Sequence, residues 1–249
     1  MPEHLALLFL PLAIFMAAGF VKGVVGLGLP TLALGLLGLV MVPSQAVAML
    51  VVPSIITNVW QLAVGPHLVS LMVRLWSLLL MSFIATLAGL WTGFLTADSG
   101  HAAMALGSIL IVYGVLGLTP LRFSVSPPME PWLSPLIGAA TGLVSAGTGV
   151  FSVPSVPYLE ALGLRRDELV QALGLFFSVC TCALAIGLWH QGAMKLSVAG
   201  ASLLALFPAL AGMALGQWVG KRIRPAVFRT CFFIVLIGLG AHLAGRAMF

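Results

Sequence analysis

The chain has 249 residues, of which 61% are hydrophobic and only 7% are charged, and its formal net charge at pH 7 is +5. Its mean hydropathy of +1.18 is far from that of soluble domains, in which roughly 25% of residues are charged. We interpret residues 1–249 as a single polytopic membrane domain, with length for about ten crossings and none left for a soluble domain.

The first half of the sequence predicts five membrane segments, at about 5–25, 26–42, 44–64, 70–95 and 101–118. The boundary between the first two lies in AGFVKGVVGLGLPTL, residues 18–32, where glycines and Pro30 interrupt an otherwise continuous apolar helix. Lipid cannot satisfy the backbone groups that such a break frees, so breaks face protein or a solvated cavity. We therefore expect a binding site at this stretch.

A proline-rich and polar linker, about 119–131, divides the chain nearly in half. Five further segments follow, at about 132–149, 150–163, 168–189, 196–220 and 226–247, and the second of these is again short. A shift of 124 residues aligns the breaks and hydroxyls of the two halves: Gly23 with Gly147, Pro30 with Pro154, Ser54 with Ser178 and Thr57 with Thr181. This recurrence predicts two repeats, at about 5–118 and about 132–247.

The distribution of basic residues predicts the orientation of these repeats. With ten crossings, nine basic residues belong to one side: Lys22, Arg74, Arg122, Arg165, Arg166, Lys221, Arg222, Arg224 and Arg229. The other side holds Lys195 and Arg246, so the positive-inside rule places the first set in the cytoplasm and both termini outside. Five crossings per half make the repeats inverted. If the two short segments are re-entrant instead, eight crossings remain and the division is seven against four; we favour ten.

The predicted fold is therefore an all-α polytopic membrane protein with two inverted-topology repeats of five segments and short broken helices at the repeat interface. Many secondary transporters have this arrangement, with the site where the breaks meet and helix N-termini that suit an anion. The candidate substrate-binding residues are Gly26, Gly28, Pro30, Thr31, Ser54, Thr57, Asn58, Gly147, Thr148, Gly149, Ser152, Pro154, Ser178 and Thr181. For each of them, the alternative is that small residues serve close helix packing.

Two charged residues near the breaks each allow two interpretations. Glu160 is the only carboxylate expected inside the membrane region, at the cytoplasmic boundary or in a proton relay, and the scarcity of such carboxylates favours an anion or neutral substrate. Lys22 either attracts an anion toward the first break or extends to the cytoplasmic face as an orientation signal. We favour the second interpretation of Lys22.

Other classes of function receive less support from the sequence. The basic residues form no stripe with interleaved aromatic residues, so we expect no nucleic-acid partner. Cys180, Cys182 and Cys231 lack the spacing of a zinc or redox motif, and no acid pair or nucleophile motif occurs. We expect no enzyme activity, no metal and no cofactor. The expected partners are a small anion and the lipid bilayer, and a homodimer stays open.

At the two breaks the chain resembles the TauE/SafE family of sulfite and organosulfonate exporters. The family's glycine-rich stretch followed by proline is matched by GVVGLGLP at 23–30 and GLVSAGTGVFSVP at 142–154, and Gly-Leu-Arg-Arg at 163–166 is also similar. The first break reads GLGLP where the family often has three consecutive glycines. The resemblance implies export of a small sulfur-containing anion, such as sulfite or sulfoacetate, across the bacterial inner membrane. An importer or channel for another small anion, or an assembly partner without transport activity, is the alternative.

Overall fold

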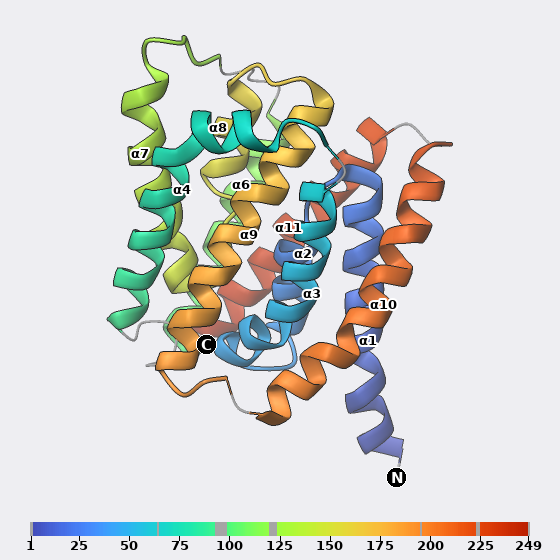
Figure 1. Ribbon diagram of the computed structural model, residues 1–249. Coiled ribbons are helices and arrows are strands. Elements are labelled where there is room, and N and C mark those ends of the chain that lie inside the picture. Colours follow the sequence, from blue (N-terminus) through green and yellow to red (C-terminus); the bar gives the residue numbers. More distant parts are fainter. Residues whose placement is uncertain are drawn as a thin grey trace.

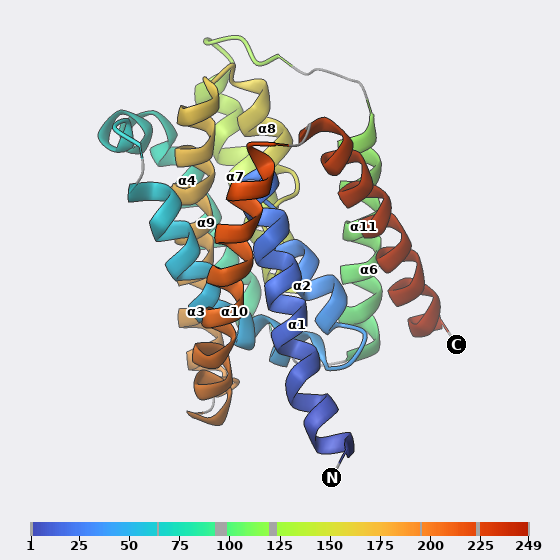
Figure 2. The same cartoon turned by 90° about the vertical axis from the view of Figure 1, so that its right-hand side faces the viewer.

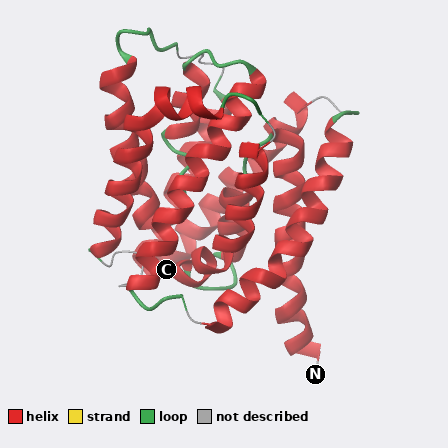
Figure 3. Ribbon diagram, in the orientation of Figure 1, coloured by secondary structure: helices red, strands yellow, loops and turns green. Residues whose placement is uncertain are grey.

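The computed structural model describes residues 2–63, 65–92, 99–119, 124–194, 196–222 and 225–248. All regular elements in this part of the chain are helices, and it contains no strand (Figure 3). In chain order they are α1 (Pro2–Val25), α2 (Leu29–Leu37), α3 (Pro43–Ala63), α4 (Leu68–Trp91), α6 (Ser99–Leu118), α7 (Glu130–Thr148), α8 (Ser155–Ala161), α9 (Arg166–His190), α10 (Leu196–Gly220) and α11 (Pro225–Met248). Six of these (α3, α4, α6, α9, α10 and α11) are long and apolar enough to cross a membrane. The expectation of an all-helical, multi-pass membrane protein is confirmed.

The two segments predicted to be short are the shortest helices in the described chain. α2 has 9 residues and α8 has 7, whereas α1 and α7, which precede them, have 24 and 19. At a rise of 1.5 Å per residue, α2 is only about 13 Å long and α8 about 10 Å, less than half of a hydrocarbon layer of roughly 30 Å. Neither helix crosses a bilayer by itself.

The helix breaks lie where the glycines and prolines predict them. Gly26 and Gly28 have φ values of 84° and 103°, a left-handed conformation that L side chains rarely adopt, and they separate α1 from α2. Gly149, with φ of 74°, ends α7 in the same way. The prediction that residues 18–32 interrupt a continuous helix is confirmed.

The long helices pack in close pairs, α1 with α10, α4 with α7, and α6 with α11. Two glycines of α1 show how tight the first pair is: a Cβ at Gly19 would lie 2.1 Å from the Ala209 carbonyl oxygen, and one at Gly23 would lie 2.3 Å from that of Met213. Residue numbers increase together along this contact, so α1 and α10 run in the same direction. They also increase together between α4 and α7, whereas α6 and α11 are antiparallel.

Consecutive long helices on either side of a short one also run in the same direction. Lys22 of α1 contacts Asn58 of α3, and Gly26, just after α1, contacts Gln61, so α1 and α3 are parallel. Parallel neighbours in sequence require a segment that brings the chain back, and α2 is that segment. α7 and α9 likewise both run parallel to α4, and α8 lies between them in the chain.

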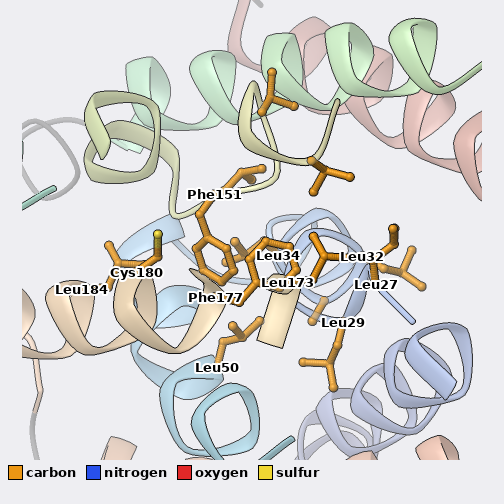
Figure 4. Packing of buried hydrophobic residues seen from close by; sticks show 14 of the residues in the cluster. Leu27, Leu29, Leu32, Leu34, Leu50, Phe151, Leu173, Phe177, Cys180 and Leu184 are labelled. Atoms are coloured by element: carbon orange, nitrogen blue, oxygen red, sulfur yellow. The ribbon is translucent and has the colours of Figure 1, made fainter. Parts of the chain in front are cut away.

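The chain ends marked N and C lie toward the same end of the bundle in both views (Figures 1 and 2). Inside the bundle, α2 is buried at every position except Leu36. The core around it combines residues that flank both breaks, with Leu34 of α2 close to Phe151 and with Phe151 against Phe177 of α9 (Figure 4). The two broken segments therefore meet in the middle of the protein.

Candidate functional site

The two breaks meet through one polar contact in an apolar setting. The hydroxyls of Thr31, in α2, and Ser152, just before α8, lie 2.8 Å apart, and both residues are buried. The chain neighbours of these two residues, Leu32 and Phe151, belong to a buried core that is mainly leucine and phenylalanine (Figure 4). The polar groups that could hold an ion gather instead beside the first break.

One face of α3 carries these polar groups. Ser54, Thr57, Asn58 and Gln61 are spaced at i, i+3, i+4 and i+7, which places them on the same side of a helix, and all four are buried. In α9, Gly174 allows the close approach that covers this face, because a Cβ there would lie 3.0 Å from the carbonyl oxygen of Asn58.

Lys22 points into this polar face. Its side chain is only 2% exposed, and its ammonium nitrogen donates a hydrogen bond of 3.1 Å to Thr57 Oγ1 and another to Asn58 Oδ1. The interpretation that Lys22 extends to the cytoplasmic face is therefore wrong. Because Gly19 and Gly23 hold α1 against α10, the neighbouring face of α1, with Lys22, is directed toward α3.

The partners of the two amides fix their orientation. A lysine ammonium only donates, so Asn58 turns Oδ1 toward it, and Gln61 must turn Nε2 toward the Gly26 carbonyl oxygen, to which it donates at 2.7 Å. Three polar atoms of this face then have no hydrogen-bond partner among the described residues: Asn58 Nδ2, Gln61 Oε1 and Ser54 Oγ. We call Lys22, Ser54, Thr57, Asn58 and Gln61 the Lys22 cluster. Buried polar atoms without partners are rare in native proteins and indicate that another group can bind there.

Within the described part of the chain, no carboxylate lies at ion-pair distance from Lys22. The carboxylates seen in ion pairs are engaged elsewhere: Glu130 with Arg74 at 2.7 Å, Glu160 with Arg229 at 3.0 Å, and Asp167 with Arg165 at 2.9 Å. An isolated buried charge is costly unless it is paired. The Lys22 cluster therefore has the composition of an anion site whose counter-charge comes from a ligand.

A pocket of about 180 Å³ reaches the Lys22 cluster. Lys22, Gly26 and Gln61 line it, together with Arg166 and Gln217. A second recess of about 360 Å³ has Gln61 and Arg166 in its wall as well, and adds Asp167 and Gly65. The two hollows are neighbours because Gln61 and Arg166 line both of them, and together they extend from the N-terminus of α9 to Lys22.

The predicted hydroxyls of the second half are not part of this cluster. Ser178 donates to the Gly174 carbonyl oxygen, Thr181 to that of Phe177 and Thr148 to that of Val144, each at 2.7 Å within its own helix. The other candidates have backbone and packing positions: Gly28 is against Phe232, Pro30 lies in the first turn of α2, Gly147 in the last turn of α7, Gly149 against Val47, and Pro154 just before α8.

Three residues near the pocket were not identified from the sequence as site residues. Gln61 follows Thr57 and Asn58 at helical spacing, and that spacing could have identified it. Arg166 and Gln217 come from distant helices and carry no local signal. Among the described residues, no group of three or more His, Cys, Asp or Glu side chains could hold a metal ion.

Glu160 lies at the end of the protein where the paired arginines gather. It pairs with Arg229 of α11, and its side chain is 30% exposed. Of its two interpretations, this placement favours the boundary position over a buried proton relay.

Comparison with known proteins gives one result. A family model described as "Sulfite exporter TauE/SafE" matches residues 11–243, a range that includes both breaks and the whole Lys22 cluster. A search of curated proteins and a search of solved structures each returned no match.

Proposed function

Because the chain belongs to the sulfite exporter TauE/SafE family, whose members are membrane transporters and not enzymes, we propose that it exports sulfite or a similar small organosulfonate such as sulfoacetate. Family membership and the six long apolar helices make it a multi-pass membrane transporter of sulfur anions. The particular anion, the outward direction and the bacterial inner membrane are our proposal.

The observation that carries the proposal is the buried residue Lys22 in the wall of a pocket. An anion that reaches Lys22 from the pocket supplies the counter-charge that no described residue provides. Two donors without a partner in the described structure, Asn58 Nδ2 and Ser54 Oγ, lie on the same face of α3. Hydrogen bonds to charged groups contribute roughly 1.5 to 3 kcal/mol each. Thr57 and Asn58, which belong to the predicted site, then position the ammonium.

The outward direction is supported by the side on which the pocket opens. Arg166 lines the pocket and begins α9. At the same end, Arg74 pairs with Glu130 of α7, Arg165 with Asp167 of α9 and Arg229 with Glu160 of α8. Under the positive-inside rule this end faces the cytoplasm. A site that opens there takes up its anion from inside the cell.

Two inverted repeats are part of the proposal, and the helix pairing supports them. If α1, α2, α3, α4 and α6 correspond to α7, α8, α9, α10 and α11, then the pair α1–α10 exchanges with α7–α4, and α3–α10 exchanges with α9–α4. The pairs α3–α9 and α6–α11 each join equivalent helices, and each is antiparallel. Ten segments of alternating direction, two of them short, account for this pattern.

Flux measurements test the function. Purified protein in proteoliposomes with an inside-negative potential should release labelled sulfite, and Lys22→Met should reduce the apparent affinity about tenfold to hundredfold, the equivalent of one charged hydrogen bond. Lys221→Met removes the same charge outside the pocket and is the matched control. Equal flux in both variants, or no sulfite flux in the wild type, would contradict the proposed function.

Cysteine labelling tests the topology separately. In a background without the three native cysteines, Thr92→Cys should react with an impermeant reagent from outside the cell, because α4 ends there. Pro127→Cys, in the linker before α7, should react only after permeabilisation. The opposite pattern would reverse the proposed orientation.

A further inference from the structure

We infer that the Lys22 cluster is selective for charge, and that it takes anions with one negative charge in preference to dianions of the same size and shape. The inference rests on the proposed function and concerns the same site. It separates candidates that family membership treats alike, since sulfite can move as hydrogensulfite, whereas sulfoacetate carries both a sulfonate and a carboxylate.

The count of buried charges is the first argument. Lys22 is the one charged residue of the cluster, and its described neighbours Thr57, Asn58 and Gln61 are neutral. Arg166 also lines the pocket but is exposed, so solvent screens its charge. A monoanion beside Lys22 leaves the buried site neutral. A dianion leaves one negative charge in a site where unpaired charge is costly.

The orientation of Gln61 is the second argument. Its Nε2 is held by the Gly26 carbonyl oxygen, so the atom without a partner is Oε1, an acceptor in the wall of the pocket. An amide oxygen with its partial negative charge repels additional negative charge and accepts a proton donor. A protonated oxyanion such as hydrogensulfite supplies a donor to Oε1, and its other oxygens accept from Lys22 and Asn58.

The second recess, of about 360 Å³, adds no second cation to the buried site. Arg166 and Asp167 both line this recess, and Asp167 accepts a hydrogen bond from Arg165 at 2.9 Å and lies 3.6 Å from His67. Positive and negative groups are therefore mixed in this recess. A dianion that passes through it meets a single positive charge at the Lys22 cluster.

Methanesulfonate and sulfate provide the direct test, because both are tetrahedral and have five non-hydrogen atoms but carry one and two negative charges. We expect methanesulfonate to compete with labelled sulfite in proteoliposomes at least tenfold more strongly than sulfate does. Equal or stronger competition by sulfate would overturn the inference. If labelled sulfite itself does not move, the proposed function fails, and the inference fails with it.

A charge-balancing variant locates the selectivity. Asn58→Asp keeps the side-chain shape and places a carboxylate next to Lys22, so the variant should bind methanesulfonate at least tenfold more weakly while its thermal stability is maintained. Asn58→Leu, which removes the oxygen without adding charge, is the matched variant and should lose less affinity than Asn58→Asp. If the two variants bind methanesulfonate equally, or Asn58→Asp binds it as the wild type does, Lys22 does not set the charge preference.

Discussion

The surroundings of Lys22 in α1 and of Ala146 in α7 differ sharply, although the shift of 124 residues that aligns the two breaks also aligns these two positions. Lys22 faces Thr57, Asn58 and Gln61, whose counterparts at this shift are Thr181, Cys182 and Ala185. Ala146 is buried and meets Gly89 of α4, where an added Cβ would lie 2.5 Å from the alanine Cβ. At this position the first half has a polar cluster, whereas the second half has a close contact between α7 and α4.

The two halves repeat the order of their helices but not the chemistry of their side chains. Both halves have a long helix, a glycine break, a short buried helix and a hydroxyl-bearing helix. The cation and the two amides occur in the first half alone. In the proposed function a single charged site serves the anion, and the second half contributes Ser152, which contacts Thr31, and Arg166, which lines the pocket.

Moving the charge to the second half should have the largest effect. Ala146→Lys forces an ammonium into a tightly packed contact with no acceptor side chain equivalent to Asn58, and we expect a loss of stability of roughly 3 to 5 kcal/mol, as for an uncompensated buried charge. Thermal unfolding in detergent measures this, with Ala146→Ser as the control of similar size. Wild-type stability in Ala146→Lys would mean that the second half also has space and acceptor groups for a buried ammonium.

Removal of the two equivalent threonine hydroxyls should give a smaller and one-sided effect. Thr57→Val removes an acceptor of Lys22 and should weaken sulfite binding about tenfold to hundredfold. Thr181 donates within its own helix, so Thr181→Val should change binding by no more than about twofold, since a substitution without a lost ligand contact is worth a few tenths of a kcal/mol. Equal losses in both variants would show that both halves bind the anion.

Ser54 and Ser178, which are equivalent in the two halves, should differ in how much their hydroxyls contribute to thermal stability. Ser54 Oγ is buried without a partner in the described structure, so Ser54→Ala removes an unsatisfied group and should leave thermal stability unchanged or higher. Ser178→Ala loses a hydrogen bond to Gly174 and should be destabilised by about 1 kcal/mol or less. Unfolding curves of both variants side by side decide the point. A clear loss of stability in Ser54→Ala would show that its hydroxyl has a partner.

The smallest effect should come from Glu160, the acidic residue of α8. Its pair with Arg229 is partly exposed, and such pairs contribute about 0 to 1 kcal/mol. We expect electrogenic anion efflux without proton coupling, driven by about 2.3 kcal/mol per 100 mV for a monovalent anion. Glu160→Gln should keep most of the anion current in the absence of a pH gradient. A current that requires a pH gradient and disappears in Glu160→Gln would assign a proton relay to this carboxylate.

Much of the fold could be predicted because its signals are local. Glycines at 26 and 28 and Pro30 mark the first break in any apolar context, and the apolar runs between turns fix the long helices to within a few residues. Counting arginines and lysines also predicts the side of the membrane to which each loop belongs, and the cysteine-labelling experiment tests that prediction.

The position of the polar cluster could not be predicted in the same way. Lys22 lies near the end of the first predicted membrane segment, and that position favoured an exposed ammonium. Its inward direction depends on Gly19 and Gly23, which hold the neighbouring face of α1 against α10, 190 residues away in the sequence. The hydroxyls of Ser178 and Thr181 look the same in sequence as those of Ser54 and Thr57, and only the neighbouring helices distinguish them.

The parallel arrangement of α1 and α3 has a consequence for how the chain enters the membrane during synthesis. A nine-residue helix is far shorter than the about 20 residues that hold a nascent segment in the bilayer, so α2 must insert together with α1 or α3 as one unit. If α2 failed to insert, α3 would cross the bilayer in the opposite direction. Arg165 and Arg166 would then lie on the side opposite the proposed cytoplasmic side. The basic loops on which the proposed orientation rests would then also act during biogenesis, because they resist translocation and so favour the inserted form of a helix too short to insert alone.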